Sequence, residues 1–132
     1  MSLLQEARRL LRLYKFFPKK RLGQNFLIDS DLLRRLLVYA SISDVDIVLE
    51  VGAGLGFLTR LLAQKCRKVI AVEIDSKLVK ILREQLRDLP NVELIEGDVL
   101  AVTIPPFNKV VSAPPDSISS PLLFWLLERR FD

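Results

Sequence analysis

Three alternating glycines are the residues of this chain whose spacing points most directly to chemistry. Gly52, Gly54 and Gly56 follow an apolar run at residues 47–51, and helical spacing resumes from Phe57. Because glycine lacks a Cβ, such a turn can bend sharply and let a ligand touch the main chain. Strand, glycine turn and helix together are how an open α/β sheet brings backbone N–H groups to a nucleotide-like ligand. The alternative is a tight strand-to-helix turn that binds nothing.

The spacing of this loop distinguishes between ligands. A dinucleotide fingerprint has glycines in the order G-x-G-x-x-G, but here the third glycine comes one residue early and Phe57 takes its place. Glu50, just before the loop, would repel a pyrophosphate and suits a ligand that presents an ammonium group or hydroxyls. The amino-acid end of S-adenosylmethionine has this character, so the loop favours that cofactor over a dinucleotide.

Further carboxylates follow the other predicted strands. Glu73 ends the run at residues 68–73, about 20 residues after the glycine loop, where a carboxylate can accept hydrogen bonds from both hydroxyls of a ribose. Asp98 follows the run at residues 92–96 and could accept a hydrogen bond from an adenine amino group. Acids at strand ends also cap helices, but together with Glu50 these two favour a nucleoside pocket beyond the carboxyl ends of the strands.

The elements that must position these residues alternate between strand and helix. Apolar runs predict strands at 47–51, 68–73, 92–96 and 109–112, and helical spacing predicts helices at 3–15, from Asp29 or Ser30, at 57–65, at 76–88 and from Pro121. Such alternation predicts an α/β fold with a parallel, doubly wound sheet of the Rossmann-like kind. The chain stops after the helix that follows the fourth strand, so we expect one sheet edge to be short or uncovered.

Composition limits the class of protein. A chain of 132 residues that is 50% hydrophobic predicts one domain with a modest core. No apolar run approaches the roughly 20 residues that span a membrane. Residues 1–17 are charged and helical; they resemble a transit peptide in being Arg-rich, but their low serine content favours a first helix of the fold.

Cysteine and histidine usage narrows the chemistry. The single Cys66 excludes an internal disulfide, fits a reducing compartment and is better interpreted as a small helix residue than as a nucleophile. Histidine is absent, which excludes Ser–His and Cys–His catalysis and any histidine-ligated metal. We therefore expect no metal and chemistry that works without a histidine base.

Positive charge is concentrated near the N-terminus. Residues 1–35 hold nine Lys or Arg against three acidic residues, a net charge of +6, so the remaining residues carry −2 of the total +4. A basic third of this kind is expected for a protein that binds a phosphate backbone. A solvated helix face explains the charge equally well.

Four short motifs occur together in this chain. They are Gln24-Asn25-Phe26-Leu27, Leu49-Glu50-Val51-Gly52-Ala53-Gly54-Leu55-Gly56, Val72-Glu73-Ile74-Asp75 and Glu96-Gly97-Asp98. In combination they resemble the ribosomal RNA adenine dimethyltransferases, a family that includes antibiotic-resistance adenine methylases and relatives of mitochondrial transcription factors. The resemblance extends from Lys19 to Glu128, nearly the whole chain.

The resemblance implies an activity and a cofactor. It implies S-adenosylmethionine-dependent methylation of adenine N6 in small-subunit ribosomal RNA. Gln24 and Asn25 would lie against the cofactor, the glycine loop would hold its methionine part, Glu73 its ribose and Asp98 its adenine. The predicted cofactor-binding residues are Gln24, Asn25, Leu27, Glu50, Gly52, Gly54, Gly56, Glu73, Ile74, Asp98 and Val99.

The chain departs from the family at the fourth strand. The family reads Asn-Leu-Pro-Tyr and then Asn-Ile-Ser-(Ser/Thr)-Pro, whereas this chain has Ala113-Pro114-Pro115-Asp116 at the catalytic positions and then Ser117-Ile118-Ser119-Ser120-Pro121. In the family the Asn holds the target N6 amine and the aromatic ring stacks on the flipped base. Ala113 has no amide oxygen and Asp116 has no π face, so we expect impaired turnover.

Three hypotheses follow from this departure. The first is an RNA adenine N6-methyltransferase, or a piece of one, with attenuated catalysis. The second is a non-catalytic module that binds S-adenosylmethionine and RNA, as in ribosome assembly or transcription. The third is a methyltransferase for another substrate, with Pro114 and Pro115 shaping a different pocket.

From the resemblance, we expect this chain to contain only part of the family's domain organisation. Residues 1–18 would be a basic amphipathic helix and residues 19–132 part of the S-adenosylmethionine-binding domain. The family's C-terminal helical domain, which helps to grip RNA, is absent, so we expect a fragment or a degenerate relative with weak RNA affinity. The expected compartment is the cytoplasm, with the mitochondrion as the alternative.

Overall fold

Between residues 47 and 96, strands and helices alternate along the chain as the spacing predicts. The computed structural model describes residues 3–14, 30–112 and 127–128. The elements are α1 (Leu3–Leu13), α2 (Ser30–Tyr39), β1 (Ile47–Val51), α3 (Phe57–Lys65), β2 (Lys68–Glu73), α4 (Ser76–Gln85), β3 (Val92–Glu96), β4 (Lys109–Ser112) and β5 (Leu127–Glu128). No helix within these described ranges is long and apolar enough to cross a membrane.

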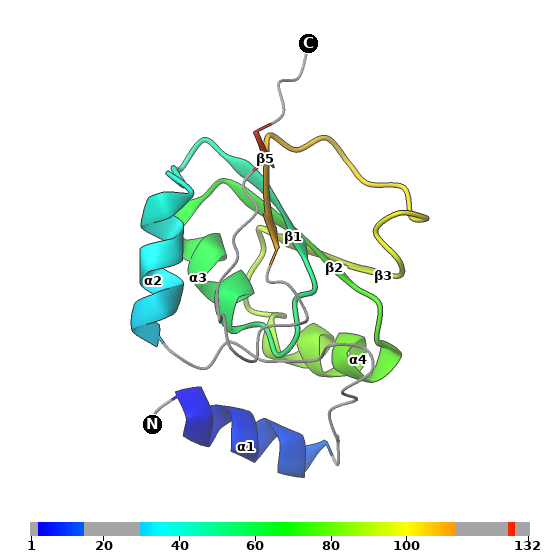
Figure 1. The fold of residues 1–132 in the computed structure, drawn as a ribbon. Coiled ribbons are helices and arrows are strands. Elements are labelled where there is room, and N and C mark those ends of the chain that lie inside the picture. The colour runs from blue at the N-terminus through cyan, green and yellow to red at the C-terminus, as the bar shows by residue number, and fades with distance from the viewer. Residues whose placement is uncertain (1–2, 15–29, 113–126, 129–132) are drawn as a thin grey trace.

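The sheet has β1 at its centre. Its strand order is β3-β2-β1-β4-β5, and β1 to β4 are parallel (Figure 1). Because β1 pairs with β2 on one side and with β4 on the other, the order reverses at the carboxyl end of β1. That switch point is where open α/β sheets bind their ligands. The glycine loop begins there, since Val51 is in register with Val72 and Ser112.

The four predicted strands are confirmed at their predicted bounds, while two helices end earlier than predicted. α1 ends at Leu13 rather than at 15, and α4 ends at Gln85 rather than at 88. After α4, Leu86 leaves helical geometry and caps the helix through its N–H on Leu82. Helix periodicity in the sequence continues through this turn, so it gives no stop signal.

The end of the chain differs from the helix expected after the fourth strand. Pro121, its predicted first residue, lies outside the described residues. Leu127–Glu128 form β5, which pairs antiparallel with β4 at Val110 and Lys109. A helix from Pro121 therefore does not run through residue 127. A two-residue strand has no periodicity that a sequence could reveal; pairing with the free edge of β4 decides it.

Alternate residues of the central strands point to opposite faces of the sheet. Val48 and Val69 lie on the face covered by α2, α3 and α4, with Leu62 of α3 and Leu82 of α4. Leu49, Ile70 and Val72 lie on the other face. In the part of the chain that the structure describes, this second face is covered by the segment 99–107 rather than by a helix. Burial on both faces explains why β1 and β2 read as continuous apolar runs.

α1 packs across the carboxyl edge of the sheet (Figure 1). Its Leu10 is 1% exposed and clusters with Leu55 of the glycine loop and with Leu78 and Ile81 of α4. Tyr14, just beyond the helix, packs on this cluster and donates a hydrogen bond to the Glu84 carboxylate. The helix predicted near the N-terminus thus packs against the glycine loop.

A buried polar network joins the amino ends of β1 and β4. Lys109 Nζ lies 2.9 Å from Asp46 Oδ2 and donates to the Ser41 carbonyl at 2.6 Å. Asn108 Nδ2 donates to Asp46 Oδ1 at 2.8 Å, and its Oδ1 accepts the Ile47 N–H at 2.6 Å. Asp46 is 4% and Lys109 8% exposed. This network fixes the register of the two strands at the edge opposite the glycine loop.

Candidate cofactor-binding site

All three glycines of the loop adopt a backbone that other residues avoid. Their φ angles are +81° at Gly52, +60° at Gly54 and +88° at Gly56. A Cβ on Gly52 would meet nothing within 4 Å, whereas one on Gly56 would lie 3.0 Å from a Leu82 methyl. Gly52 therefore leaves open space over the loop for a ligand. Gly56, the N-cap of α3, allows close packing of the loop on α4.

Glu73 reaches back from the end of β2 to the glycine loop. Its Oε1 accepts the Gly54 N–H at 2.9 Å and its Oε2 accepts the Asp75 N–H at 3.0 Å. Burial raises the pKa of Glu73, although backbone N–H groups of Asp75, Gly54 and Ile74 oppose the shift. Each carboxylate oxygen can accept a second hydrogen bond. The two sequence motifs thus meet at a single carboxyl group.

Glu50 lies beneath the loop rather than facing outward from it. The side chain is 2% exposed and accepts a hydrogen bond from the Thr59 hydroxyl of α3. Burial raises the pKa of Glu50 to about 8, with the Thr59 hydrogen bond opposing the shift and the nearby Glu73 adding to it. The carboxyl group is therefore mostly protonated at neutral pH in this arrangement. That Glu50 receives an ammonium group stays a prediction.

Sequence reasoning missed Thr59 as the partner of Glu50. It is 0% exposed and shares the buried face of α3 with Leu58 and Leu62. A polar residue within the apolar stripe of an amphipathic helix was the available signal, because burial of a hydroxyl requires a hydrogen-bond partner.

Glu50→Gln is expected to flatten the pH dependence of the unfolding free energy between pH 4.5 and about 8. In that window the folded state keeps a proton on Glu50 that the unfolded state has lost. The stability contributed by this proton is complete below 4.5 and is lost as the pH rises towards 8, at up to about 1.4 kcal/mol per pH unit. Urea unfolding at several pH values measures the slope. Glu96→Gln, at an exposed carboxylate, should leave it unchanged, and parallel curves for E50Q and the parent would contradict the prediction.

The end of β3 lies against the end of β2. The Gly97 N–H donates to the Glu73 carbonyl at 2.9 Å, which brings the following Asp98 to the same edge. Gly97 has φ +144°, and a Cβ there would lie 2.4 Å from a Val102 methyl, so the turn requires glycine. Asp98 is exposed, and one of its carboxylate oxygens accepts the Leu100 N–H at 2.9 Å. Among the described residues, its second oxygen accepts no hydrogen bond, which leaves it available to an amino group.

Two apolar side chains accompany these carboxylates. Ile74, directly after Glu73, is 60% exposed, which is unusual for a large aliphatic residue next to a buried strand. Val99, directly after Asp98, is half-buried and packs with the second face of the sheet. Ile74 therefore offers an exposed apolar surface directly after Glu73, on which a flat ring can pack.

The remaining predicted site residues cannot be placed. Gln24, Asn25 and Leu27 lie outside the described residues, and so do Ala113, Pro114, Pro115 and Asp116. The structure thus brings together Glu50, Gly52, Gly54, Gly56, Glu73, Ile74, Asp98 and Val99 at one edge of the sheet.

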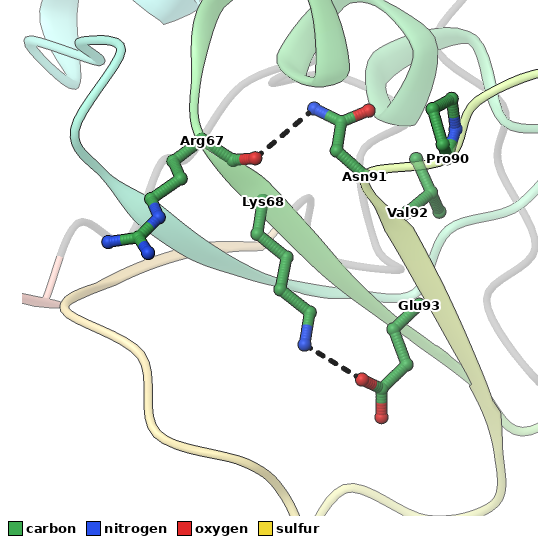
Figure 2. A pocket seen from close by; sticks show the side chains of 6 residues that line it. All are labelled: Arg67, Lys68, Pro90, Asn91, Val92 and Glu93. Atoms are coloured by element: carbon green, nitrogen blue, oxygen red, sulfur yellow. Dashed lines mark hydrogen bonds and ion pairs between the residues drawn. The ribbon is translucent and has the colours of Figure 1, made fainter.

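A hollow of about 430 Å³ lies at the opposite edge, where β2 and β3 begin (Figure 2). Two of its polar side chains are already paired: Lys68 Nζ lies 2.9 Å from Glu93 Oε1, and Asn91 Nδ2 donates to the Ala63 carbonyl at 2.8 Å. Ligands of open α/β sheets bind at the carboxyl ends of the strands, so this hollow is not the candidate site.

Cys66 does not contribute a nucleophile. It is 8% exposed at the end of α3, and its thiol donates to the Lys68 carbonyl. Burial raises the pKa of Cys66 to about 11, so the reactive thiolate is scarce at neutral pH.

Comparison with known proteins shows which family the sequence matches. The family model for ribosomal RNA adenine dimethylase matches residues 16–132. A "probable ribosomal RNA small subunit methyltransferase A" from Thermococcus kodakarensis is 49% identical over 119 residues, which are 90% of this chain and 42% of the relative. Its counterpart from Pyrococcus abyssi is 46% identical over 123 residues, 93% of this chain and 45% of the relative. The chain thus spans less than half the length of these curated relatives.

Solved structures show the same fold. A dimethyladenosine transferase from Plasmodium falciparum superposes with a TM-score of 0.63 at 33% identity, over 74% of this chain and 36% of that one. The 23S rRNA methyltransferase ErmE superposes with a TM-score of 0.64 at 41% identity, over 74% and 40%. An RNA methyltransferase from Salinibacter ruber in complex with S-adenosyl-L-homocysteine shares the fold at 23% identity, with a TM-score of 0.59 over 66% of this chain and 60% of that one.

Proposed function

The chain belongs to the ribosomal RNA adenine dimethylase family, and from this premise we propose that it binds S-adenosylmethionine at the carboxyl edge of its sheet and serves the methylation of adenine N6 in ribosomal RNA. One observation carries the proposal: the Gly54 N–H donates to Glu73 at 2.9 Å. This contact joins the loop that suits a methionine moiety to the carboxylate that suits a ribose.

The described residues fit this cofactor. The open space above Gly52 admits its amino-acid part, and the Glu73 carboxylate at the end of β2 is the proposed acceptor for the ribose hydroxyls. The exposed Ile74 supports the adenine ring, and the free oxygen of Asp98 accepts its amino group. Glu50 takes part from beneath the loop, where it holds α3 through Thr59. Gln24, Asn25, Leu27 and Val99 complete the proposed cofactor contacts.

For this reaction, the main task of the protein is to hold the cofactor and the target adenine and to orient them towards each other. The bound cofactor supplies an electrophilic sulfonium methyl group. The exocyclic amine of adenine is a poor nucleophile, because its lone pair is delocalised into the ring. Hydrogen-bond acceptors that hold this nitrogen in line, about 3 Å from the methyl group, provide most of the help. No histidine base is required, which fits a chain without histidine.

A second candidate function follows from the substituted catalytic positions. Ala113 and Asp116 stand where the family has the amide and the aromatic ring, so acceptors for the amine and stacking for the base are lost. A module that binds cofactor and RNA without turnover is consistent with this, as is a methyltransferase whose Pro114 and Pro115 shape a pocket for another substrate.

Ala113→Asn combined with Asp116→Tyr is expected to raise methyl transfer while leaving cofactor affinity within about twofold, because the change restores an acceptor and a stacking ring without touching the glycine loop. Calorimetry with S-adenosylmethionine measures affinity. Transfer of labelled methyl groups to unmodified small-subunit RNA measures turnover.

The same two measurements separate the candidates. Cofactor binding with transfer by the parent supports the enzyme, and binding without transfer favours the non-catalytic module. Absence of cofactor binding by the parent would contradict both the enzyme and the non-catalytic module. A double variant that gains no activity would count against our interpretation of the fourth strand.

The RNA partner, the compartment and the division of the chain into segments are also proposals. We propose small-subunit ribosomal RNA as the partner, since the curated relatives are named for that subunit, and the cytoplasm as the compartment. Residues 1–18 would form the basic helical segment, and residues 19–132 would be part of the cofactor-binding domain.

A further inference from the structure

α1 is attached to the glycine loop itself. Leu10, 1% exposed, clusters with Leu55 between the second and third loop glycines, and with Ile81 of α4. Tyr14 adds a polar contact with Glu84, and Gln85 Nε2 donates to its hydroxyl at 3.4 Å. The position of α1 is therefore coupled to that of the proposed cofactor loop.

The opposite face of α1 carries unpaired positive charge. Arg8 and Arg12 are exposed and lie four residues apart, so they share one face of the helix. At about 3.6 residues per turn, that face points away from Leu10. Arg9 pairs with Glu6 at 2.6 Å. Among the described residues, Arg8 and Arg12 have no ion-pair partner.

Two arginines presented in this way suit phosphate groups. A guanidinium forms a planar fork that binds phosphate through two hydrogen bonds and stays charged at every relevant pH. α1 lies at the carboxyl edge of the sheet (Figure 1), the edge at which cofactor and target base would meet. Residues 1–35 carry a net charge of +6, which adds long-range attraction for a polyanion.

We propose that the Arg8–Arg12 face of α1 binds the phosphate backbone of the substrate RNA. The packing of α1 on Leu55 holds this contact at a fixed position relative to the cofactor loop. The proposal rests on the proposed function for its RNA substrate. It assigns to α1 a positioning role, since neither arginine reaches the reacting atoms.

The test replaces both arginines in the 132-residue chain. R8Q/R12Q is expected to weaken binding of a labelled RNA hairpin with adenines in its loop roughly tenfold at low salt, and to reduce the slope of log affinity against log salt by about 2. R8K/R12K should restore most of the affinity and the slope. Affinity for S-adenosylmethionine and the thermal unfolding midpoint should stay unchanged, because both side chains are exposed.

The matched control removes the same charge elsewhere. Arg83 of α4 and Arg87, just beyond the end of that helix, are also exposed and four residues apart, but they do not belong to α1. R83Q/R87Q should leave most of the RNA affinity intact. Equal losses from the two pairs, or no loss from R8Q/R12Q, would overturn the proposal for α1 while leaving the proposed function standing. Failure of the unmodified chain to bind the RNA would overturn both, and cofactor calorimetry would then show whether cofactor binding survives.

Discussion

Lys109→Met is expected to lower the free energy of unfolding by about 3–5 kcal/mol. The substitution keeps the apolar length of the side chain but leaves Asp46, 4% exposed, without the ammonium that lies 2.9 Å from it. The Ser41 carbonyl also loses the donor it has at 2.6 Å. Urea unfolding of the two proteins at neutral pH measures the difference.

Lys68→Met is the matched control. Lys68 begins β2 as Lys109 begins β4, but its ion pair with Glu93, also 2.9 Å long, is exposed (Figure 2). Exposed pairs contribute about 0–1 kcal/mol, so this variant should unfold close to the parent. Equal losses from the two lysines would show that burial does not strengthen the pair with Asp46. D46N/K109M should be less destabilised than K109M alone, because no buried charge is left unpaired.

The same network predicts behaviour in acid. Burial by itself raises the pKa of Asp46, but hydrogen bonds from Asn108, Ser43 and Lys109 outweigh it and bring the pKa below 3.8. A lowered carboxyl pKa contributes stability that is present above 3.8 and is lost as the pH falls through the folded-state pKa. K109M removes one cause of the shift, so it should lose less stability than the parent on acidification below this point.

Glu73→Gln is expected to weaken S-adenosylmethionine binding roughly 100-fold, about 2.7 kcal/mol. The carboxylate loses its charge, and hydrogen bonds to charged groups contribute about 1.5–3 kcal/mol each. The new amide NH₂ would also face either the Gly54 or the Asp75 N–H, which now donate to the two carboxylate oxygens. One of these two backbone N–H groups therefore loses its acceptor, in addition to the loss of the proposed ribose contact. Calorimetry gives the affinity directly.

Glu96→Gln serves as the control for this measurement. Glu96 is paired in register with Glu73 on the neighbouring strand, but its side chain is exposed and lies outside the proposed contacts. E96Q should bind the cofactor as the parent does. Unchanged affinity in E73Q would contradict the assignment of the ribose to Glu73, and an equal loss in E96Q would point to general electrostatics instead.

Much of the fold follows from local patterns. The bounds of β1 to β4 coincide with the apolar runs, because strands buried on both faces need continuous apolar sequence. The start of α4 follows from Asp75, whose carboxylate accepts the Lys77 and Leu78 N–H groups. The glycine loop follows from its spacing, since three positive φ angles in five residues suit glycine alone.

Contacts between distant residues did not follow from the sequence. Glu50 accepts a hydrogen bond from Thr59 beneath the loop, and its role towards a ligand stays a prediction. Asp46 and Lys109, 63 residues apart, carry no common motif, and their pairing exists only because β1 and β4 lie side by side.

By itself the sequence determined where the four parallel strands begin and end and which candidate residues follow them, because strand periodicity, glycine backbone freedom and charge are properties of short segments. Tertiary structure decided which of these groups are ionised, which are open to a ligand and which hold one another in place. Parallel pairing brought Glu73 onto the glycine loop, burial kept the proton on Glu50, and the packing of Leu10 on Leu55 placed a basic helix beside the proposed cofactor. Solvation and proximity depend on the whole fold, so no local pattern encodes them.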